Sequence, residues 1–406
     1  MRALLALCAL AIAVAVAACS ATGPDTGTKT GVQATIPAGS SPPRVVTATC
    51  TGRTSDAASL QQAISSSSPG SVIEIRGACL LTRGIIFLAD RTYTGYNTTG
   101  TVLKQDGDMS YVLASQAYAD DSSWTGQPVT IRDLTVECNG SGGTNGIVVL
   151  NWQADVEGVD VHDCGGSGIV DTNRTADGKA IKNTSVNSRF DNNFISNSGR
   201  YGFEIYDSGN SVTDGFLDDN LIANSGLDGI HLDNAAGWDI SGNHLYGNSW
   251  NGIYADRLYG TTISNNYIED FGHKPGSGTW CGIAATVQGG IGSTIFNNKI
   301  FNDRGESAGA KYIYLCVTGT NYGTGYLTVT GNVIVGDHSS DVGLAFDGGP
   351  NKLIVASSGN EVAHVGTTNS VTRSATVTAG TRRPAQSHKP ARLTSRGSYR
   401  RPPGAD

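Results

Sequence analysis

The chain has 406 residues, of which 54 are glycine, 12 are proline and 38% are hydrophobic. Glycine and proline together stay well below the roughly 25 to 30% of a low-complexity chain, so the composition excludes a disordered repeat and favours a folded protein with a large core. The net charge is −7, and the body is more acidic still because basic residues gather in the C-terminal tail. Phosphate binding needs a basic surface, so we exclude nucleic acid as the partner.

The N-terminus has the features of an export signal. Residues 1–18 combine Arg2 with an apolar run that is short for a transmembrane helix, which is typical of a signal peptide. Val16-Ala17-Ala18-Cys19 resembles the lipobox of bacterial lipoproteins, which implies lipidation of Cys19; the alternative is an ordinary signal peptide cleaved nearby. Residues 19–44, rich in small and polar residues, suit a flexible tether. We therefore predict an extracellular, cell-surface lipoprotein that meets the membrane only through its lipid anchor.

The remaining cysteines suit an oxidising compartment. Once Cys8 leaves with the signal peptide and Cys19 is lipidated, the other cysteines are even in number, which favours disulfides over metal thiolates. The preferred pairs are Cys50 with Cys79 and Cys138 with Cys164. Cys281 and Cys316 do not fall opposite each other in the repeat described below, so the sequence leaves their pairing open.

The folded region begins with a helix and continues in strands. Residues 55–64 have a capping serine and helical spacing. Short strand-like runs follow at residues 72–75, 84–88, 101–104 and 129–136. We expect the helix to cover the open end of a stack of strands, where it satisfies an otherwise exposed edge.

From about residue 186 a short pattern recurs: Asn, any residue, an aliphatic residue, then a gap and Gly before an apolar residue. The recurring asparagines include Asn193, Asn220, Asn243 and Asn266. Units of three short strands without a helix cannot bury their apolar faces alone, so they must stack. The asparagine suits left-handed backbone geometry and can form a hydrogen-bonded ladder. The sequence predicts an all-β protein, a right-handed parallel β-helix over residues 45–365 with a short N-terminal capping helix.

These features resemble the pectate-lyase-like superfamily, whose members often open with such a helix and strand; the resemblance covers roughly residues 50–365. It implies the fold, while the superfamily itself includes lyases, hydrolases, epimerases and phage fibres. Residues 366–406, basic and rich in Pro, Ser and Thr, are expected to be a disordered tail. We expect the protein to be a monomer.

Polar outward side chains concentrate on three adjacent coils. Counting from the Gly step, residues alternate between the interior and the outside. The proposed catalytic residues are Tyr201, Glu204, His231, Asp233 and Asp256, and the proposed substrate-binding residues are Tyr206, Asp207, Asp228, Tyr254 and Arg257. Aromatic rings beside carboxylates are what a sugar-binding groove requires. The alternative is that outward acidic residues only keep a solenoid soluble.

The spacing of the strands relates these carboxylates to one another. Adjacent strands lie about 4.8 Å apart, so Asp233 and Asp256 are expected side by side. Such a pair shares a proton, binds a cation such as Ca²⁺, or is neutralised by Arg257. Glu204 and Asp233 are expected roughly 8 Å apart, which falls in the range of inverting glycoside hydrolases.

The segment Tyr201-Gly202-Phe203-Glu204-Ile205-Tyr206-Asp207 resembles the catalytic module of the mannuronan C5-epimerases, in which Tyr-Gly-Phe runs into Asp-Pro-His-Glu. Leu227-Asp228-Gly229 is similar to the next coil of that family. The resemblance implies that Tyr201 is the catalytic tyrosine and that Glu204, Asp207 and Asp228 are the acidic residues of the site. Tyr206 stands where the family has its catalytic histidine and Ile205 replaces proline; His231, one coil along, is the candidate substitute base.

The leading hypothesis is a polysaccharide-modifying enzyme. In an epimerase or lyase, Tyr201 and His231 would exchange the C5 proton while Arg257 or a bound cation neutralises the substrate carboxylate. In a hydrolase, Glu204 would act with Asp233 or Asp256. The alternative class is a non-catalytic glycan-binding or cell-surface solenoid. The sequence requires no cofactor, and Ca²⁺ is the ion considered because it can bridge carboxylates.

Overall fold

The structure, a computed structural model, describes residues 43–120, 124, 126–273, 276–303 and 309–378. The predicted signal peptide, nearly all of the predicted tether, the lipidation site Cys19 and the tail beyond residue 378 lie outside the described residues. No helix in the described ranges is long and apolar enough to cross a membrane.

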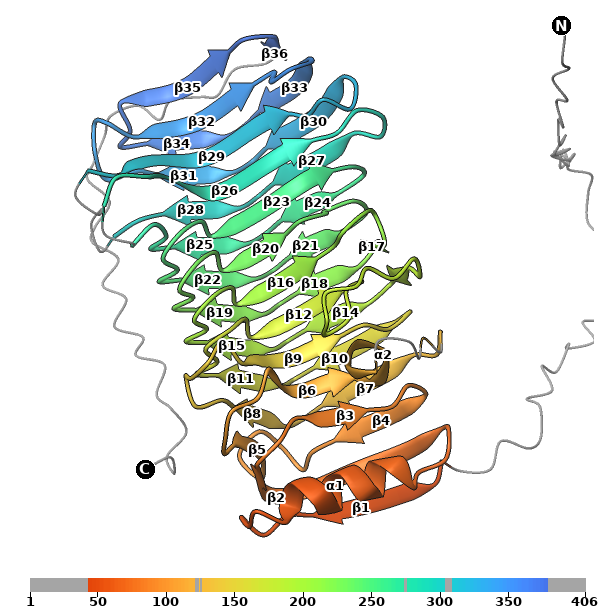
Figure 1. Cartoon of the computed structure of the whole chain (residues 1–406). Helices are drawn as coiled ribbons and strands as arrows, with labels where there is room; N and C mark the ends of the chain where they lie inside the picture. Colours follow the sequence, from red (N-terminus) through yellow and green to blue (C-terminus); the bar gives the residue numbers. More distant parts are fainter. Residues whose placement is uncertain (1–42, 121–123, 125, 274–275, 304–308, 379–406) are drawn as a thin grey trace, which may run out of the picture. The chain divides into compact units, whose positions relative to one another are not determined.

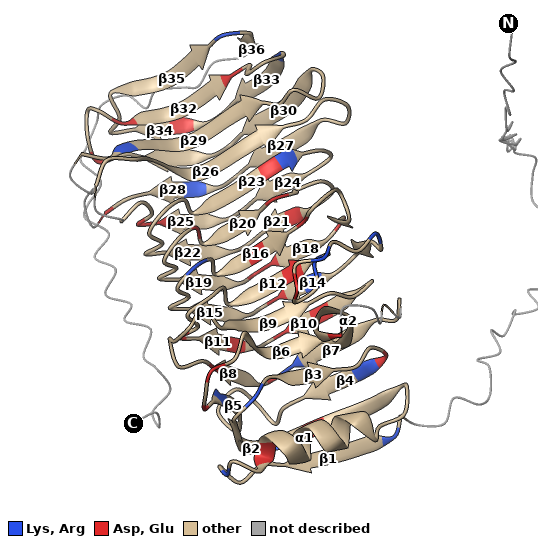
Figure 2. Cartoon of the chain, in the orientation of Figure 1, with Lys and Arg blue, Asp and Glu red and all other residues tan. Residues whose placement is uncertain are grey.

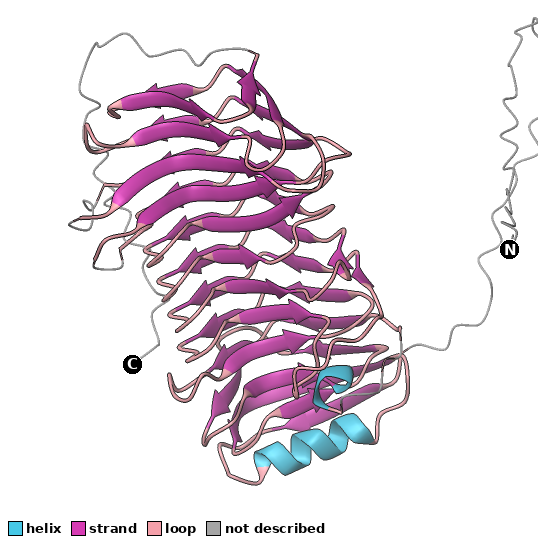
Figure 3. Cartoon of the chain, turned by 45° about the horizontal axis from the view of Figure 1, so that its top comes forward, coloured by secondary structure: helices cyan, strands magenta, loops and turns pink. Residues whose placement is uncertain are grey.

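The described chain winds into a parallel β-helix of three long sheets, and each coil adds one strand to each sheet (Figure 1). The strands are short because alternating runs such as Thr262-Ile263-Ser264 are bounded by Gly, Asn and Asp turns. Each strand pairs in parallel with its equivalents in the coils before and after it, as Ile240 does with Leu217 and Ile263. Figure 3 shows that strands and connecting loops account for nearly all of this part of the chain.

The first sheet consists, in order, of β1 (Val45–Thr49), β2 (Ser71–Leu81), β4 (Arg91–Thr94), β7 (Val129–Arg132), β10 (Ala154–Glu157), β14 (Arg189–Asp191), β18 (Phe216–Asp218), β21 (Asp239–Ser241), β24 (Thr262–Ser264), β27 (Ser293–Phe296), β30 (Gly325–Thr330), β33 (Leu353–Ser358) and β36 (Ala375–Val377). The second sheet continues from the end of β2 through β5 (Thr101–Gln105), β8 (Thr135–Glu137), β11 (Asp160–His162), β15 (Phe194–Ser196), β19 (Leu221–Ala223), β22 (His244–Tyr246), β25 (Tyr267–Glu269), β28 (Lys299–Phe301), β31 (Val333–Val335) and β34 (Glu361–Ala363).

The third sheet, which we call the site sheet, consists of β3 (Ile85–Phe87), β6 (Tyr111–Ser115), β9 (Asn145–Val149), β12 (Ile169–Thr172), β16 (Phe203–Tyr206), β20 (Ile230–Leu232), β23 (Ile253–Leu258), β26 (Thr279–Val287), β29 (Lys311–Gly319), β32 (Val342–Asp347) and β35 (Thr367–Thr372). Two short strands, β13 (Ser185–Val186) and β17 (Val212–Thr213), pair with each other in the connecting loops. The helices are α1 (Asp56–Ser65) and α2 (Gln116–Ala119).

Stacked apolar side chains fill the interior of the β-helix. In the site sheet, Phe203, Ile230, Ile253 and Ile283 occupy equivalent positions in successive strands, and none of them is exposed. This register confirms the prediction that residues directly after the Gly step point inward on these coils.

The predicted asparagine ladder is present, and Asn360 extends it by one residue beyond the recurring sequence pattern, which also includes Asn298 and Asn332. The side chain of Asn193 donates to Asn220, which donates to Asn243 and then Asn266, at 2.9–3.0 Å per step. The ladder continues through Asn298, Asn332 and Asn360. The prediction of a left-handed backbone at the ladder asparagine itself is wrong: the residue before it adopts that conformation. The ladder asparagine instead uses its amide to bond neighbouring coils.

The helix α1 caps the N-terminal end, as expected. Its apolar side chains Ala57, Leu60 and Ile64 are buried in the same core as the strands. The side chain of Gln61 both accepts from the N–H and donates to the C=O of Ile86 in β3, each at 2.9 Å. Gln61 therefore satisfies backbone groups on an edge that no further strand covers. Ser55 precedes the helix but makes no side-chain capping bond.

All three disulfides are present: Cys50–Cys79, Cys138–Cys164 and Cys281–Cys316. The sequence left the third open because the coil of β29 lacks the usual Gly. Tyr314 occupies that position and is fully buried against Phe271, so Leu315 pairs with Ile283. The observed pairing is shifted by two residues from the sequence alignment, which placed Ile313 opposite Ile283. In the observed pairing the Cα atoms of Cys281 and Cys316 lie 6.2 Å apart.

The stack extends beyond residue 365, where the sequence indicated the end of the domain. Strand β35 pairs with β32, and β36 pairs with β33, so the last described coil runs to Val377. Residues 366–378 thus contain strands rather than the beginning of a disordered tail.

One inward position of the site sheet holds a carboxyl group. Asp171 pairs with Val149 on one side and Ile205 on the other and is completely buried. The hydroxyl of Ser185 lies 3.4 Å from both of its carboxyl oxygens. Burial raises the pKa of Asp171 to about 8 although these hydrogen bonds oppose the shift, so the group is mostly protonated at neutral pH.

Candidate functional site

The predicted residues meet on the outer face of the site sheet, on the coils of β16, β20 and β23. Glu204 pairs with His231, and His231 with Tyr254, so these three outward side chains lie on neighbouring strands. Figure 2 shows acidic residues on the coils near β12, β16 and β20. The structure therefore brings together one acidic, one imidazole and one phenol group from three coils.

The ring of His231 is stacked between two tyrosine rings. Its centroid lies 4.1 Å from that of Tyr201, with an interplanar angle of 19°, and 4.7 Å from that of Tyr254, with an angle of 13°. Because both faces are covered, the edge of the ring with its two nitrogens is the part of His231 left for polar contacts. We call Tyr201, His231 and Tyr254 the aromatic stack.

Both ring nitrogens of His231 contact carboxylates. Nδ1 lies 2.8 Å from Asp228 and Nε2 lies 3.3 Å from Asp233. Burial alone would lower the pKa of His231, but hydrogen bonds and charge from Asp228 and Asp233 outweigh it and raise the pKa to about 9. At neutral pH the ring is therefore an imidazolium that donates both N–H groups. The sequence analysis named His231 as a candidate substitute base, and the ring must first lose a proton to act as one.

Asp228 is held in place by the next coil. Its side chain is 2% exposed, and its Oδ1 accepts from the backbone N–H and the side-chain Nδ2 of Asn251, at 2.9 and 2.8 Å. The side-chain oxygen of Asn251 in turn accepts from the N–H of Cys281 at 2.8 Å. A hydrogen-bonded chain thus runs from the Cys281–Cys316 disulfide through Asn251 and Asp228 to His231. Asp228 positions the imidazole in this structure, and its contact with a substrate stays a prediction.

Glu204 is buried at the base of the site. Its side chain is 7% exposed, accepts a hydrogen bond from the hydroxyl of Ser167 at 2.5 Å, and lies 3.6 Å from Arg200. The guanidinium of Arg200 also lies over the ring of Tyr201, 5.2 Å from its centroid. The sequence interpretation missed both Ser167 and Arg200. Arg200 directly precedes Tyr201 in the sequence, and this position beside the segment proposed as catalytic was the available signal.

The two phenols of the aromatic stack are protonated. Burial raises the pKa of Tyr201, and the negative charge of Asp228 adds to the shift. Burial and the charge of Asp256 likewise raise the pKa of Tyr254. In the resting state the phenols therefore donate rather than accept protons.

Neutralisation by Arg257 was one of three alternatives for the carboxyl groups of Asp233 and Asp256, and the contacts of Arg257 lie elsewhere. Its Nε donates to Gln288 at 3.2 Å, and its guanidinium lies 5.5 Å from the ring centroid of Tyr322. Asp256 accepts a hydrogen bond from the hydroxyl of Thr286. Within the described residues, Arg257 forms no ion pair with Asp233 or Asp256. The backbone of Arg257 is left-handed, with φ of 61°, and the register between β23 and β26 shifts at this point, so the regular alternation is broken there.

Asp207, predicted to bind substrate, is held by several hydrogen bonds within its own loop. One of its carboxylate oxygens accepts from three consecutive backbone N–H groups, at Asn210, Ser211 and Val212, and from Asn234. It therefore organises the loop after β16. Tyr206 is 43% exposed, and Arg174 lies over its ring at 5.0 Å, so it remains available to a ligand.

Among the described residues there is no cluster of three or more His, Cys, Asp or Glu side chains that could hold a metal ion. We therefore assign no residue of the site to Ca²⁺.

The fold places the chain among known proteins. The described β-helix is similar to the A-module of the Azotobacter vinelandii mannuronan C-5 epimerase AlgE6, with a TM-score of 0.56 at 15% identity over 83% of this chain and 97% of that one. It is also similar to the Dettilon tailspike protein, with a TM-score of 0.55 at 13% identity over 79% of this chain and 68% of that one. The Agl-KA catalytic domain is similar with a TM-score of 0.50 at 13% identity over 80% of this chain and 65% of that one. At these identities the likeness extends to the fold alone. No curated protein sequence matches the chain.

Residues 118–358, more than half of the chain, match the family described as "Right handed beta helix region". The handedness predicted from the sequence agrees with this description. The chain belongs to the family of right-handed β-helix proteins.

Proposed function

We propose that the protein is a polysaccharide-modifying enzyme that acts on a glycan bound across the outer face of the site sheet. The observation that carries the proposal is the aromatic stack with Asp228 and Asp233 bonded to the two nitrogens of His231. A half-buried imidazolium with fixed orientation and a partly exposed carboxyl group beside it is an arrangement suited to acid–base catalysis.

Proton transfer follows from the resting charges. His231 and the phenol of Tyr201 are proton donors. The carboxyl groups of Asp233 and Glu204 lie beside them and are the available acceptors. In an epimerase or lyase reaction, a carboxylate or deprotonated His231 removes the C5 proton of a uronate. Tyr201 then returns a proton to carbon or to the leaving oxygen. Arg200, in place of Arg257, would neutralise the substrate carboxylate.

A second candidate reaction is glycoside hydrolysis. Glu204 and Asp233 lie one strand and two residues apart, which is roughly 8 Å at the usual spacings and within the range expected of an inverting acid and base. We favour the epimerase or lyase reaction because Arg200 supplies a cation next to Tyr201 and Glu204.

Product analysis tests the proposal. The purified protein is incubated with alginate, polygalacturonate and neutral glucans, and unsaturated uronate, new reducing ends and C5 inversion are measured separately. Asp233→Asn should reduce product formation at least about a hundredfold, the usual effect of losing a general acid or base. Lys352→Ala, a change on a loop remote from β20, serves as the control. Glycan binding without any of these products would instead support a non-catalytic glycan-binding solenoid.

We also propose that the protein acts outside the cytoplasm as a monomer tethered by a lipid. Three disulfides within one domain support an oxidising location. Metabolic labelling of the chain with a radioactive fatty acid, compared with a Cys19→Ala variant, tests the anchor.

A further inference from the structure

A cleft outside the site just described opens beside the coil of β9. It has a volume of about 480 Å³, within the range of small-ligand sites. Its lining comes from three separate loops: Trp124, Gly126, Trp152, Lys182, Asn183 and Thr184. The loops before β7, after β9 and before β13 therefore converge on one opening.

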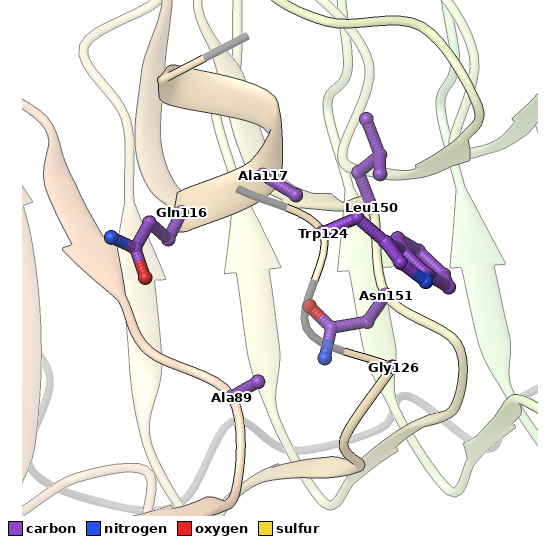
Figure 4. A pocket seen from close by; sticks show the side chains of 7 residues that line it. All are labelled: Ala89, Gln116, Ala117, Trp124, Gly126, Leu150 and Asn151. Carbon is purple, nitrogen blue, oxygen red and sulfur yellow. The ribbon is translucent and has the colours of Figure 1, made fainter. Parts of the chain in front are cut away.

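Two indole rings dominate this cleft. Trp152 is 38% exposed although it belongs to a residue type that is usually well buried. Figure 4 shows Trp124 between Leu150 and Asn151, in a small adjoining pocket that shares Trp124 and Gly126 with the cleft. The two indoles are not stacked on each other or on another ring in the described structure, so their faces are available to a ligand.

The loop that carries Trp152 is firmly held. The N–H of Leu150 donates to Ser115 at 2.7 Å, Asn151 donates to the C=O of Gln127 at 2.8 Å, and the C=O of Trp152 accepts from Val186 at 2.9 Å. The exposed ring of Trp152 is therefore presented on an anchored backbone. A preformed aromatic surface loses little conformational entropy when it binds a ligand.

Three of the side chains that line the cleft, Trp124, Trp152 and Lys182, carry only hydrogen-bond donors, and Asn183 and Thr184 carry both donors and acceptors. Within the described ranges, the indole N–H groups of Trp124 and Trp152 and the ammonium of Lys182 have no hydrogen-bond or ion-pair partner. The lining contains no acidic residue. This is the opposite of the acidic centre around His231, so the cleft is complementary to a ligand rich in oxygen acceptors with an apolar face. A sugar ring has both properties.

The cleft lies on the path of a glycan that would occupy the proposed active site. From the coil of β9 to that of β20 there are three strand steps, through β12 and β16, or about 14 Å at the usual spacing. The exposed ring of Tyr206, under Arg174, stands between them at the position equivalent to Asp233. Exposed aromatic and donor groups thus continue from the site toward the cleft.

We propose that the cleft is a distal sugar-binding subsite in which one unit of the glycan stacks on Trp152 while Lys182 binds its oxygens. The inference rests on the proposed function, since it assigns the occupant to the same glycan. A sugar unit is about as long as one strand spacing, so a chain of about four units is needed to fill both places. The protein therefore binds long oligosaccharides more tightly than short ones.

The experiment measures binding and not turnover. Calorimetric titration of the full mature chain uses the disaccharide and hexasaccharide of mannuronate, galacturonate and cellobiose-type glucan. For at least one series the hexasaccharide should bind more tightly than the disaccharide. Trp152→Ala should weaken hexasaccharide binding at least about tenfold, the loss typical of an exposed tryptophan that anchors a ligand, and leave disaccharide binding unchanged. Trp152→Phe should retain most of the affinity.

Tyr96→Ala is the matched control, because Tyr96 is 80% exposed and does not line the cleft. Equal hexasaccharide affinity in Trp152→Ala and wild type would overturn the subsite, as would a wild-type chain that binds none of the hexasaccharides. A different result would contradict the proposed function alone. Tight hexasaccharide binding that depends on Trp152, with no product from any polysaccharide, would support the subsite and show that the protein is not an enzyme for these glycans.

Discussion

His231 is enclosed at both faces and both nitrogens, so its removal affects the folded protein as well as any reaction. Its partner Asp228 is almost completely buried and relies on His231 for its positive charge. An outward residue of a solenoid usually contributes little to stability. His231 is an exception, because the group behind it is a buried carboxylate.

We expect His231→Ala to lower the free energy of unfolding by about 1–3 kcal/mol, the cost of leaving a buried polar group without its partner. Asp233→Asn should leave it nearly unchanged because that side chain is 37% exposed. Urea denaturation of both variants measures the difference. Changing Asp228 to Asn in the His231→Ala background should restore part of the loss; equal midpoints for His231→Ala and wild type would show that the contact contributes nothing.

Asp171 should make the stability of the protein fall with rising pH. A carboxyl whose pKa is raised from 3.8 to about 8 binds its proton more tightly in the folded state. Its favourable contribution is complete below the unfolded pKa near 4 and is lost as the pH rises through about 8. Asp171→Asn cannot ionise, so its urea midpoint should change less than that of wild type between about pH 5 and pH 9. Parallel curves for the two proteins over this range would contradict the assignment.

At the scale of single elements, the Cys281–Cys316 disulfide joins β26 to β29 and supports Asn251 next to the site. Changing both cysteines to serine should remove the clamp on the hydrogen-bonded chain from Cys281 to His231. We expect glycan turnover to fall about tenfold or more, with the apparent pKa of His231 shifted downward in NMR titration. The corresponding change at Cys50 and Cys79, near α1, should lower stability by about 3 kcal/mol without this shift. An unchanged His231 titration in the first variant would separate the disulfide from the site.

The sequence predicted the fold well because each coil repeats the same information. Gly steps, alternating aliphatic residues and the recurrent asparagine all indicate one register. An irregular sequence in one coil therefore does not change the register that the neighbouring coils predict. The β29 coil shows the limit, since Tyr314 replaces Gly and shifts the apparent register by two. Asp171 is the third residue after Gly168 and therefore points inward, so the alternation of the strand alone could have identified it as a buried carboxyl group.

The sequence predicted that the candidate site residues lie on one face of adjacent coils, but it predicted their contacts less well. Strand pairing fixes Glu204 beside His231, and this follows from register. The orientation of Arg257 depends on a left-handed residue, and the raised pKa of His231 depends on rotamers that place both nitrogens against carboxylates. Such details arise from side-chain geometry, which a repeat pattern does not encode.

At the scale of the whole described domain, stability depends on contacts between successive coils, because each coil contacts only its neighbours. The last coil therefore contributes one interface and protects the edge of the coil before it. Strands β35 and β36 pair along β32 and β33.

A chain that ends at residue 365 should be less stable than one that ends at residue 378 and more prone to associate, since it exposes β32 and β33 as edge strands. Size-exclusion chromatography over a concentration series, together with urea denaturation, measures both effects. Identical elution and midpoints for the two chains would mean that the final coil protects nothing.

The asparagine ladder also bears on chemical ageing. Each rung donates its amide N–H₂ to the oxygen of the next rung, from Asn193 to Asn360. Deamidation of one rung would replace that donor with a second oxygen and set two acceptors against each other inside the core. The rungs are at most 2% exposed, which shields them from the water that hydrolysis consumes. Deamidation of the ladder asparagines should therefore occur only in molecules whose β-helix has locally unfolded. The fraction of deamidated ladder asparagines would then measure how often the β-helix unfolds during the lifetime of the protein.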